Sequence, residues 1–294
     1  MAEFDPKRVL CPVDFSVPSA AALRLAGGMA KTFGAELTVL LAQHLEAPVY
    51  FTAAQMQALK AQLRRSIRAA RASVADFAAK YLPEDLPRVI EVVEDDPVAA
   101  ILRTAKKSKA GLVVMGTHGR TGLAKVRLGS VMESVLRQSN VPILTVGPGI
   151  KSVASLGAIR RILYPVNYTS LAKSAFEHAR ELAERTGAEL ILIHIAEQST
   201  PGQGLDEARR TLCDWAAPDV RERCSVKEVV RQGNSAEQIV AEAKRSGADL
   251  MVIGAQPRES LGAMLFGSTT EAVIRHAPCP VLSVIWRESG TKHN

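Results

Sequence analysis

The sequence lacks long apolar runs and lacks paired cysteines. No stretch approaches the roughly 18 continuous apolar residues of a membrane span. The first residues, MAEFDPKRVLCPVD, have no apolar segment behind a basic start, which a secretory signal would show. The four cysteines lie far apart without a CxxC pair. We therefore expect a soluble, cytoplasmic protein with free thiols, and neither a disulfide framework nor a metal site.

Aromatic residues are also scarce, at 4%, whereas 47% of the residues are hydrophobic. The core must therefore consist mainly of Ala, Val, Leu and Ile, which suits parallel sheets covered by Ala-rich helices. A net charge of +7 permits an acidic partner. One helical face carries Lys60, Arg64, Arg68 and Arg71. Because no aromatic residues interleave this basic stripe, we favour a solvated helix face over a nucleic-acid interface.

The chain contains one pattern twice. Residues 8–37 align without a gap onto residues 161–190, so that RVLCPVDFS corresponds to RILYPVNYT. Later, VPILTV at 141–146 corresponds to CPVLSV at 279–284. The second copy is shorter by 15 residues, lost between its second strand and its third helix. A Gly- and Ser-containing linker separates the copies, which predicts two domains, 1–149 and 150–294.

Short apolar runs alternate with helical segments in each copy. In the first copy they predict strands at 7–13, 35–42, 87–93, 111–116 and 142–146, and helices at 18–33, 52–81, 96–109 and 129–138. Such alternation predicts a parallel sheet with helices on both faces. Ligands bind such sheets beyond the carboxyl ends of the strands, where the winding direction reverses. The loops after the first and fourth strands are therefore the candidate site.

The loop after the fourth strand favours an anion. Gly116, Gly119, Gly129 and Ser130 form a Gly-x2-Gly-x9-Gly-Ser pattern, and Arg120, Lys125 and Arg127 add positive charge without an acid. Glycines let backbone N–H groups approach an anion, and a helix beginning at Gly129-Ser130 would suit a phosphate. Ser130 could add a hydroxyl donor or cap the helix. The pattern is neither a Walker A loop nor a Rossmann fingerprint. Alternatively, the glycines only shape the loop.

Asp14 follows the first strand, in CPVDFS, and is expected to project toward the loop after the fourth strand. A carboxylate there could accept from a ribose hydroxyl or an adenine amino group. It could instead cap the following helix together with Ser16. The neighbouring glycines favour the ligand role.

Taken in order, PVDFS, VVMGTHG and the glycine pattern resemble the ATP-binding members of the universal stress protein family over essentially the whole chain, twice. The resemblance implies a five-stranded parallel sheet in each domain, adenine near the first two strands, and a triphosphate at the glycine loop, with a divalent metal such as magnesium. It also implies a stress-response regulator rather than an efficient enzyme, at most a weak ATPase. Members commonly pair through their last strands, as a domain pseudo-dimer or a homodimer.

Nucleotide contacts are expected on thirteen residues of the first copy, eleven placed by the resemblance and two added on charge and position. They are Pro12, Val13, Asp14, Ala42, Met115, Gly116, His118, Gly119, Arg120, Arg127, Gly129, Ser130 and Val131. His118 and Arg127 rest only on charge and position, and His118 could equally be an exposed loop residue.

The second copy departs from this pattern. Asn167 replaces Asp14 and Pro257 replaces Gly119, which removes a backbone donor and fixes φ. Ala263 and Leu265 replace Lys125 and Arg127. We therefore expect ATP in the first copy only, with no catalytic residues assigned. The alternatives are a scaffold without nucleotide and an ATP-using enzyme with an unidentified substrate. The apolar last strands of the two copies are expected to cover each other.

Overall fold

The computed structural model describes most of the chain. The described residues are 4–43, 53–119, 128–148, 150, 159–196, 203–216, 218–255, 258–260, 263–265 and 267–285, and every structural statement below concerns these. Within them, no helix is both long and apolar enough to cross a membrane.

The first repeat folds as the alternation predicts. Its elements are β1 (Arg8–Pro12), α1 (Val17–Phe33), β2 (Glu36–Gln43), α2 (Ala53–Tyr81), β3 (Arg88–Glu94), α3 (Pro97–Ser108), β4 (Leu112–Gly116), α4 (Ser130–Gln138) and β5 (Ile143–Val146). Its strands are parallel and lie in the order β3-β2-β1-β4-β5. The winding direction therefore reverses between β1 and β4, which places a crevice at their carboxyl ends.

The second repeat has the same order of core elements. They are β6 (Arg161–Val166), α5 (Ser170–Thr186), β7 (Glu189–Ala196), α6 (Gln203–Trp215), α7 (Pro218–Arg223), β8 (Val226–Gln232), α8 (Ser235–Ser246), β9 (Leu250–Ala255), α9 (Ser268–His276) and β12 (Val281–Ile285). The two short helices α6 and α7 stand where the first repeat has the 29-residue α2. This is where the sequence places the deletion.

One small element was not predicted from the sequence. An antiparallel hairpin, β10 (Arg258–Ser260) and β11 (Ala263–Leu265), interrupts the loop between β9 and α9. The corresponding part of the first repeat lies outside the described residues.

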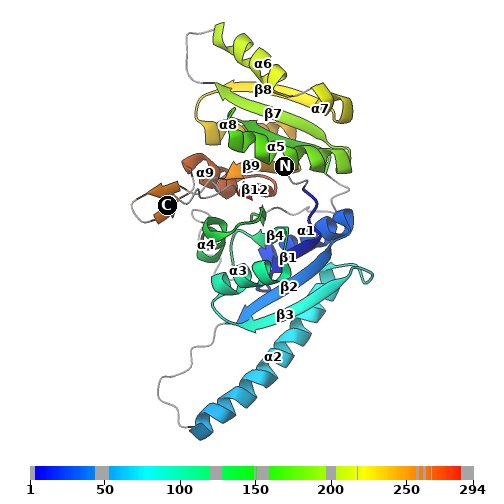
Figure 1. The fold of residues 1–294 in the computed structure, drawn as a ribbon, viewed down its shortest axis with the longest axis vertical. Coiled ribbons are helices and arrows are strands. Elements are labelled where there is room, and N and C mark those ends of the chain that lie inside the picture. The colour runs from blue at the N-terminus through cyan, green and yellow to red at the C-terminus, as the bar shows by residue number, and fades with distance from the viewer. Residues whose placement is uncertain are drawn as a thin grey trace, which may run out of the picture.

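The two repeats share one continuous sheet (Figure 1). Strand β5 pairs with β12 in antiparallel orientation, in register Thr145 with Val281, Leu144 with Leu282 and Ile143 with Ser283. The predicted mutual covering of the last strands is confirmed. Because these two edges pair with each other, they are not available to a second chain.

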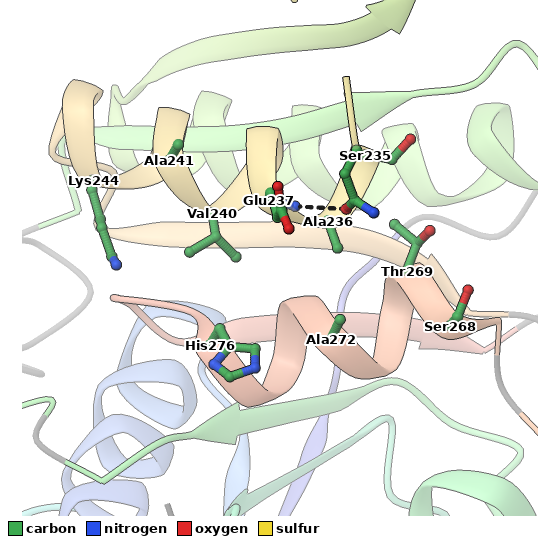
Figure 2. Close-up of a pocket in the computed structure, with 11 residues that line it drawn as sticks. Ser235, Ala236, Glu237, Val240, Ala241, Lys244, Ser268, Thr269, Ala272 and His276 are labelled. Atoms are coloured by element: carbon green, nitrogen blue, oxygen red, sulfur yellow. Dashed lines mark hydrogen bonds between the residues drawn. The ribbon is translucent and has the colours of Figure 1, made fainter. Parts of the chain in front are cut away.

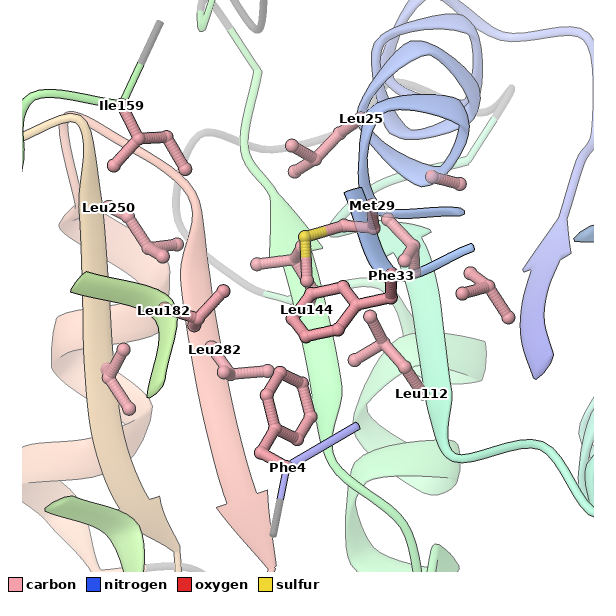
Figure 3. Close-up of a cluster of buried hydrophobic side chains, with 14 of the residues drawn as sticks. Phe4, Leu25, Met29, Phe33, Leu112, Leu144, Ile159, Leu182, Leu250 and Leu282 are labelled. Carbon is pink, nitrogen blue, oxygen red and sulfur yellow. The ribbon is translucent and has the colours of Figure 1, made fainter. Parts of the chain in front are cut away.

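Two apolar layers cover the sheet, and each runs through both repeats. One layer packs α1, α2, α5 and α6 against the strands. The other packs α3, α4, α8 and α9 against the opposite face. Leu144 and Leu282 meet at the centre of the first layer (Figure 3). The two repeats therefore share a core rather than merely touching.

The N-terminal segment lies between the repeats (Figure 1). Phe4 is buried and contacts the ring of Phe33 in α1, with centroids 5.4 Å apart, and the ring of His178 in α5, with centroids 4.6 Å apart. Arg185 of α5 lies over the Phe33 ring at 4.9 Å. These contacts connect α1 to α5 through residues that precede the first strand.

The basic stripe predicted on α2 is only partly described. Arg68 is exposed, whereas the Nη2 atom of Arg71 donates to the carbonyl oxygen of Ile90 at 2.8 Å. Arg71 therefore has a structural role in holding α2 against β3. The side chains of Lys60 and Arg64 lie outside the described set.

A first prediction concerns the seam between β5 and β12. Thr145 and Ser283 occupy equivalent buried positions, but only Thr145 has a hydroxyl partner, the Val281 carbonyl oxygen at 3.2 Å. Thr145→Val should lower the free energy of unfolding by about 1 kcal/mol. Ser283→Ala, the matched control, should leave it unchanged or raise it slightly, because no hydrogen bond is lost. Urea unfolding measures both, and equal losses would contradict the assignment.

A second prediction concerns pH. Burial lowers the pKa of His178 below its usual range, because a charged imidazole is poorly solvated beside Phe4. The stability that the neutral ring contributes is present above the unfolded-state pKa and is lost as pH falls through the lower folded-state pKa. His178→Gln should therefore reduce the fall in urea midpoint between pH 7.5 and 5.5. The exposed His276→Gln is the control, and an equal effect of both variants would refute the prediction.

Candidate functional site

A pocket of about 310 Å³ lies at the switch point of the first repeat. It opens where β1 and β4 end and where α3 and α4 begin. Its volume is at the lower end of the range for small-molecule sites. The location agrees with the two loops indicated by the sequence.

Eleven of the thirteen predicted residues line this pocket, namely Pro12, Val13, Asp14, Ala42, Met115, Gly116, His118, Gly119, Gly129, Ser130 and Val131. Arg120 and Arg127 lie outside the described residues. Five lining residues were not predicted, namely Ser19, Pro97, Ile101, Thr117 and Met132. Pro97 and Ile101 stand one turn apart at the start of α3, so the helical period could have indicated them.

Asp14 joins the two loops of the site. Its Oδ1 atom accepts from the backbone N–H of Ser16 at 3.0 Å, while the Ser16 hydroxyl accepts from the N–H of Ser19 at 3.2 Å and caps α1. A Cβ built at Gly119 would lie 3.0 Å from Oδ2 of Asp14. The cap of α1 is therefore Ser16 and not Asp14, whose Oδ1 shapes the turn before the helix while Oδ2 faces the glycine loop.

The turn after Asp14 is strained in the same way in both repeats. Phe15 has φ 64° and the equivalent Tyr168 has φ 58°, in the left-handed region. For a residue other than glycine, this left-handed conformation costs roughly 1 kcal/mol or more of conformational free energy. An Asx-type turn holds this conformation in each copy: Oδ1 of Asp14 accepts from the N–H of Ser16 at 3.0 Å, and Oδ1 of Asn167 accepts from the N–H of Thr169 at 3.3 Å.

Two of the glycines have packing reasons that are independent of any ligand. A Cβ at Gly116 would lie 2.9 Å from Cβ of Pro18, and a Cβ at Gly129 would lie 3.0 Å from the carbonyl oxygen of Thr117. The alternative that glycines shape the loop therefore holds at both positions. Gly119 differs, because the atom that a Cβ would approach belongs to Asp14.

Thr117 connects the glycine loop to the seam between the repeats. Its N–H donates to the carbonyl oxygen of Val146, the last residue of β5, and its own carbonyl oxygen accepts from the N–H of Gly129, both at 2.9 Å. Its hydroxyl lies 2.9 Å from Nδ1 of His118. This buried threonine thus fixes the start of α4 and the ring of a pocket histidine.

Helix α4 begins in the pocket without a side-chain cap. Gly129 is the N-cap residue and, having no side chain, makes no side-chain bond to the first turn, and no other side chain in the part of the chain that the structure describes caps this turn. Ser130 is the first helical residue, so its alternative role as a cap is wrong. An uncapped helix start carries partial positive charge and can hold an anion.

The second repeat has a smaller pocket at the equivalent place, of about 230 Å³. Asn167, His194, Ser235, Thr269 and Thr270 line it, where the first repeat has Asp14, Leu41, Pro97, Val131 and Met132. The Nδ1 atom of His194 lies 2.9 Å from the carbonyl oxygen of Val166. The second pocket therefore has an amide, Asn167, in place of the carboxylate of Asp14, and hydroxyl groups in place of apolar side chains.

The strand order defines a doubly wound α/β protein, and the switch-point pocket with its helix start is the candidate ligand site at its crevice. The sequence matches the universal stress protein family twice, over residues 6–147 and 158–284. The chain belongs to the universal stress protein family as a tandem member.

Individual relatives agree with this assignment. A universal stress protein of Mycolicibacterium smegmatis is 28% identical over 300 residues, covering 94% of this chain and 96% of that one. A universal stress protein of Methanocaldococcus jannaschii is 30% identical over 145 residues, covering 48% of this chain and 81% of its own. A crystal structure of an Archaeoglobus fulgidus universal stress protein has a TM-score of 0.67 at 23% identity, covering 95% of this chain and 98% of that one, which supports the fold.

A third prediction separates packing from ligand binding at the glycines. Gly129 and Gly267 are the N-cap residues of α4 and α9, but no described atom lies within 4 Å of a Cβ built at Gly267. Gly129→Ala should therefore cost about 1 kcal/mol more than Gly267→Ala, because the Thr117 carbonyl must shift. Thermal and urea unfolding without ligand provide the measurement. Equal costs would show that Gly129 is not constrained by packing.

Proposed function

We propose that this protein is an ATP-binding regulator of the stress response, acting in the cytoplasm, which binds its nucleotide in the first repeat. The single observation that carries the proposal is the composition of the first pocket. Apolar side chains, a carboxylate and an uncapped helix start face one cavity at the switch point. This combination suits a flat apolar base, a ribose and an anionic chain, in that order.

The residues fit the parts of ATP in the following way. Val13, Ala42 and Met115 would contact adenine, and Asp14 would accept hydrogen bonds from the ribose or from the adenine amino group. Gly119, Gly129 and Ser130 would face the phosphates, which suit the first turn of α4. Arg120 and Arg127, with magnesium carried by the nucleotide, would supply the remaining positive charge. All thirteen assignments are part of this proposal.

Binding is favoured over turnover. A phosphoryl-transfer enzyme needs a fixed cation on the phosphates, a carboxylate for the metal and a group that positions the nucleophile. Among the described residues of the pocket, Asp14 and His118 are the ionisable side chains, and Asp14 is assigned to the adenosine end. Hydrolysis should therefore be slow or absent.

The second repeat is proposed to complete the shared sheet without holding a triphosphate. Its pocket lacks the carboxylate, and its loop has lost two of the cationic residues of the first repeat. We place the boundary between the two domains near residue 150, in the linker. Each charge-assisted hydrogen bond to a phosphate contributes about 1.5–3 kcal/mol, so the loss of two lowers affinity by orders of magnitude.

The fourth prediction is a stoichiometry close to one ATP per chain. Calorimetric titration with ATP and magnesium should show a single site, Asp14→Ala should remove most of the binding, and Asn167→Ala should leave it unchanged. Asp14→Asn is the sharper variant, because Asn167 forms the same turn in the second repeat with an amide oxygen. It preserves the turn, removes the charge and should weaken binding about tenfold.

Three outcomes would contradict the proposal. Two equivalent sites would refute the asymmetry, and a loss of binding only in Asn167→Ala would place ATP in the second repeat. No binding by the folded wild-type protein, together with no adenine nucleotide released by acid from freshly purified material, would favour a nucleotide-independent scaffold.

A further inference from the structure

A second cavity, larger than the first-repeat pocket, lies between helices α8 and α9 of the second repeat. Its volume is about 720 Å³. The two helices run side by side in the same direction, with Ser235 and Ser268 at one end and Lys244 and His276 at the other (Figure 2). The cavity is distinct from the pocket of the first repeat, and it adjoins the pocket of the second repeat, with which it shares Ser235 and Thr269.

Two of the side chains that line the groove are smaller than their counterparts in the first repeat. Ala236, Val240 and Thr269 line the groove at the positions that Val98, Leu102 and Val131 occupy in the first repeat. Val98, Leu102 and Val131 are partly buried and pack against the core. Ala236 and Val240 are each smaller than their counterparts, and Thr269 has the size of Val131 but carries a hydroxyl, so these exchanges give the groove more room and a polar group.

The floor of the groove is apolar, and side chains of opposite charge line it at two places. Ala236, Val240 and Ala272 form the floor. Glu237 lines one part, and Lys244 with His276 lines the far end (Figure 2). The first repeat has Ala99 and Gln138 in place of Glu237 and His276, so both charged or ionisable groups are gained together with the groove.

The spacing of these charges defines the length of a ligand. Glu237 and Lys244 stand two turns apart on one face of α8, which corresponds to about 10 Å along the helix axis. No ion-pair partner of either side chain is present among the described residues. An ammonium group and a carboxylate about 10 Å apart would complement both ends.

Polar side chains along the wall of the groove indicate which chemical groups a ligand would carry between its two charged ends. The hydroxyls of Ser235, Ser268 and Thr269 and the amide of Asn234 face the same groove as the apolar floor. The amide oxygen of Asn234 already accepts from the N–H of Glu237 at 3.1 Å, which leaves its amide nitrogen as a donor. Such groups match the N–H and C=O of a peptide, and an extended tripeptide spans about 10 Å.

We propose that the groove between α8 and α9 binds a short peptide with free termini and small side chains. Its ammonium group lies at Glu237, its carboxylate lies at Lys244 and His276, and its backbone crosses the alanine floor. The competing explanation is that Glu237 and Lys244 only offset the dipole of α8, as acids do in a first turn and bases in a last turn. That explanation requires no ligand, so binding experiments distinguish the two.

The fifth prediction uses tri-alanine as the probe and the full-length protein. Titration followed by amide chemical shifts should give saturable shifts in α8 and α9, with an affinity of roughly millimolar or tighter. N-acetylated tri-alanine and tri-alanine amide, which each lack one terminal charge, should bind about threefold to fivefold more weakly, as expected for exposed ion pairs. An ω-amino acid, 8-aminooctanoate, has both charges but no peptide groups and should bind more weakly than tri-alanine.

Protein variants test each end separately. Glu237→Gln should weaken the binding of tri-alanine about threefold to fivefold and leave the binding of N-acetylated tri-alanine unaffected. Lys244→Gln should weaken the binding of tri-alanine to the same extent and leave the binding of tri-alanine amide unaffected. Glu222→Gln and Lys227→Gln make the same charge changes elsewhere on the surface of this repeat and should have no effect. The triple variant Ala236→Val, Val240→Leu and Thr269→Val installs the residues of the first repeat and should abolish binding while the protein stays folded.

Several results would overturn the proposal. They are the absence of saturable shifts in the folded wild-type protein, equal binding of all three tri-alanine probes, and unchanged binding by the triple variant. If 8-aminooctanoate binds as tightly as tri-alanine, the ligand class is an ω-amino acid and the peptide is wrong. None of these results depends on whether the first repeat binds ATP.

Discussion

The antiparallel pairing of β5 with β12 is the interaction on which the rest of the structure depends. Each repeat ends in an apolar strand that would expose its backbone and side chains if left unpaired. Pairing the two strands satisfies both edges at once and continues the apolar layers on both faces of the sheet. Two domains that could be drawn separately therefore share a single core.

This seam also reaches the candidate nucleotide site. Val146 is the last residue of β5, and its carbonyl oxygen accepts the N–H of Thr117, which in turn holds Gly129 and contacts His118. The geometry of the pocket thus rests on the strand that joins the repeats. A substitution in the seam between β5 and β12 is therefore expected to shift the glycine loop more than the edge strands β3 and β8.

Duplication has left one scaffold with two different surfaces. At the sheet edge, the first repeat keeps Asp14 and an apolar pocket, whereas the second has Asn167 and hydroxyl groups. Between the helices, the first repeat has Val98 and Leu102, whereas the second has the smaller Ala236 and Val240 and a groove that they line. Because the shared core keeps the backbone in place, side chains at its surface can change without loss of the fold.

The sequence by itself determined the repeat, the strand and helix order of the first copy and the pocket positions carried by the family motif. These depend on local periodicity and on residue types such as the Asp14 turn, which act over short distances. Only the tertiary structure decided why Gly116 and Gly129 must be small, since Pro18 and the Thr117 carbonyl approach them through the fold. It alone also revealed the groove between α8 and α9, because a cavity depends on how the side chains of two helices meet.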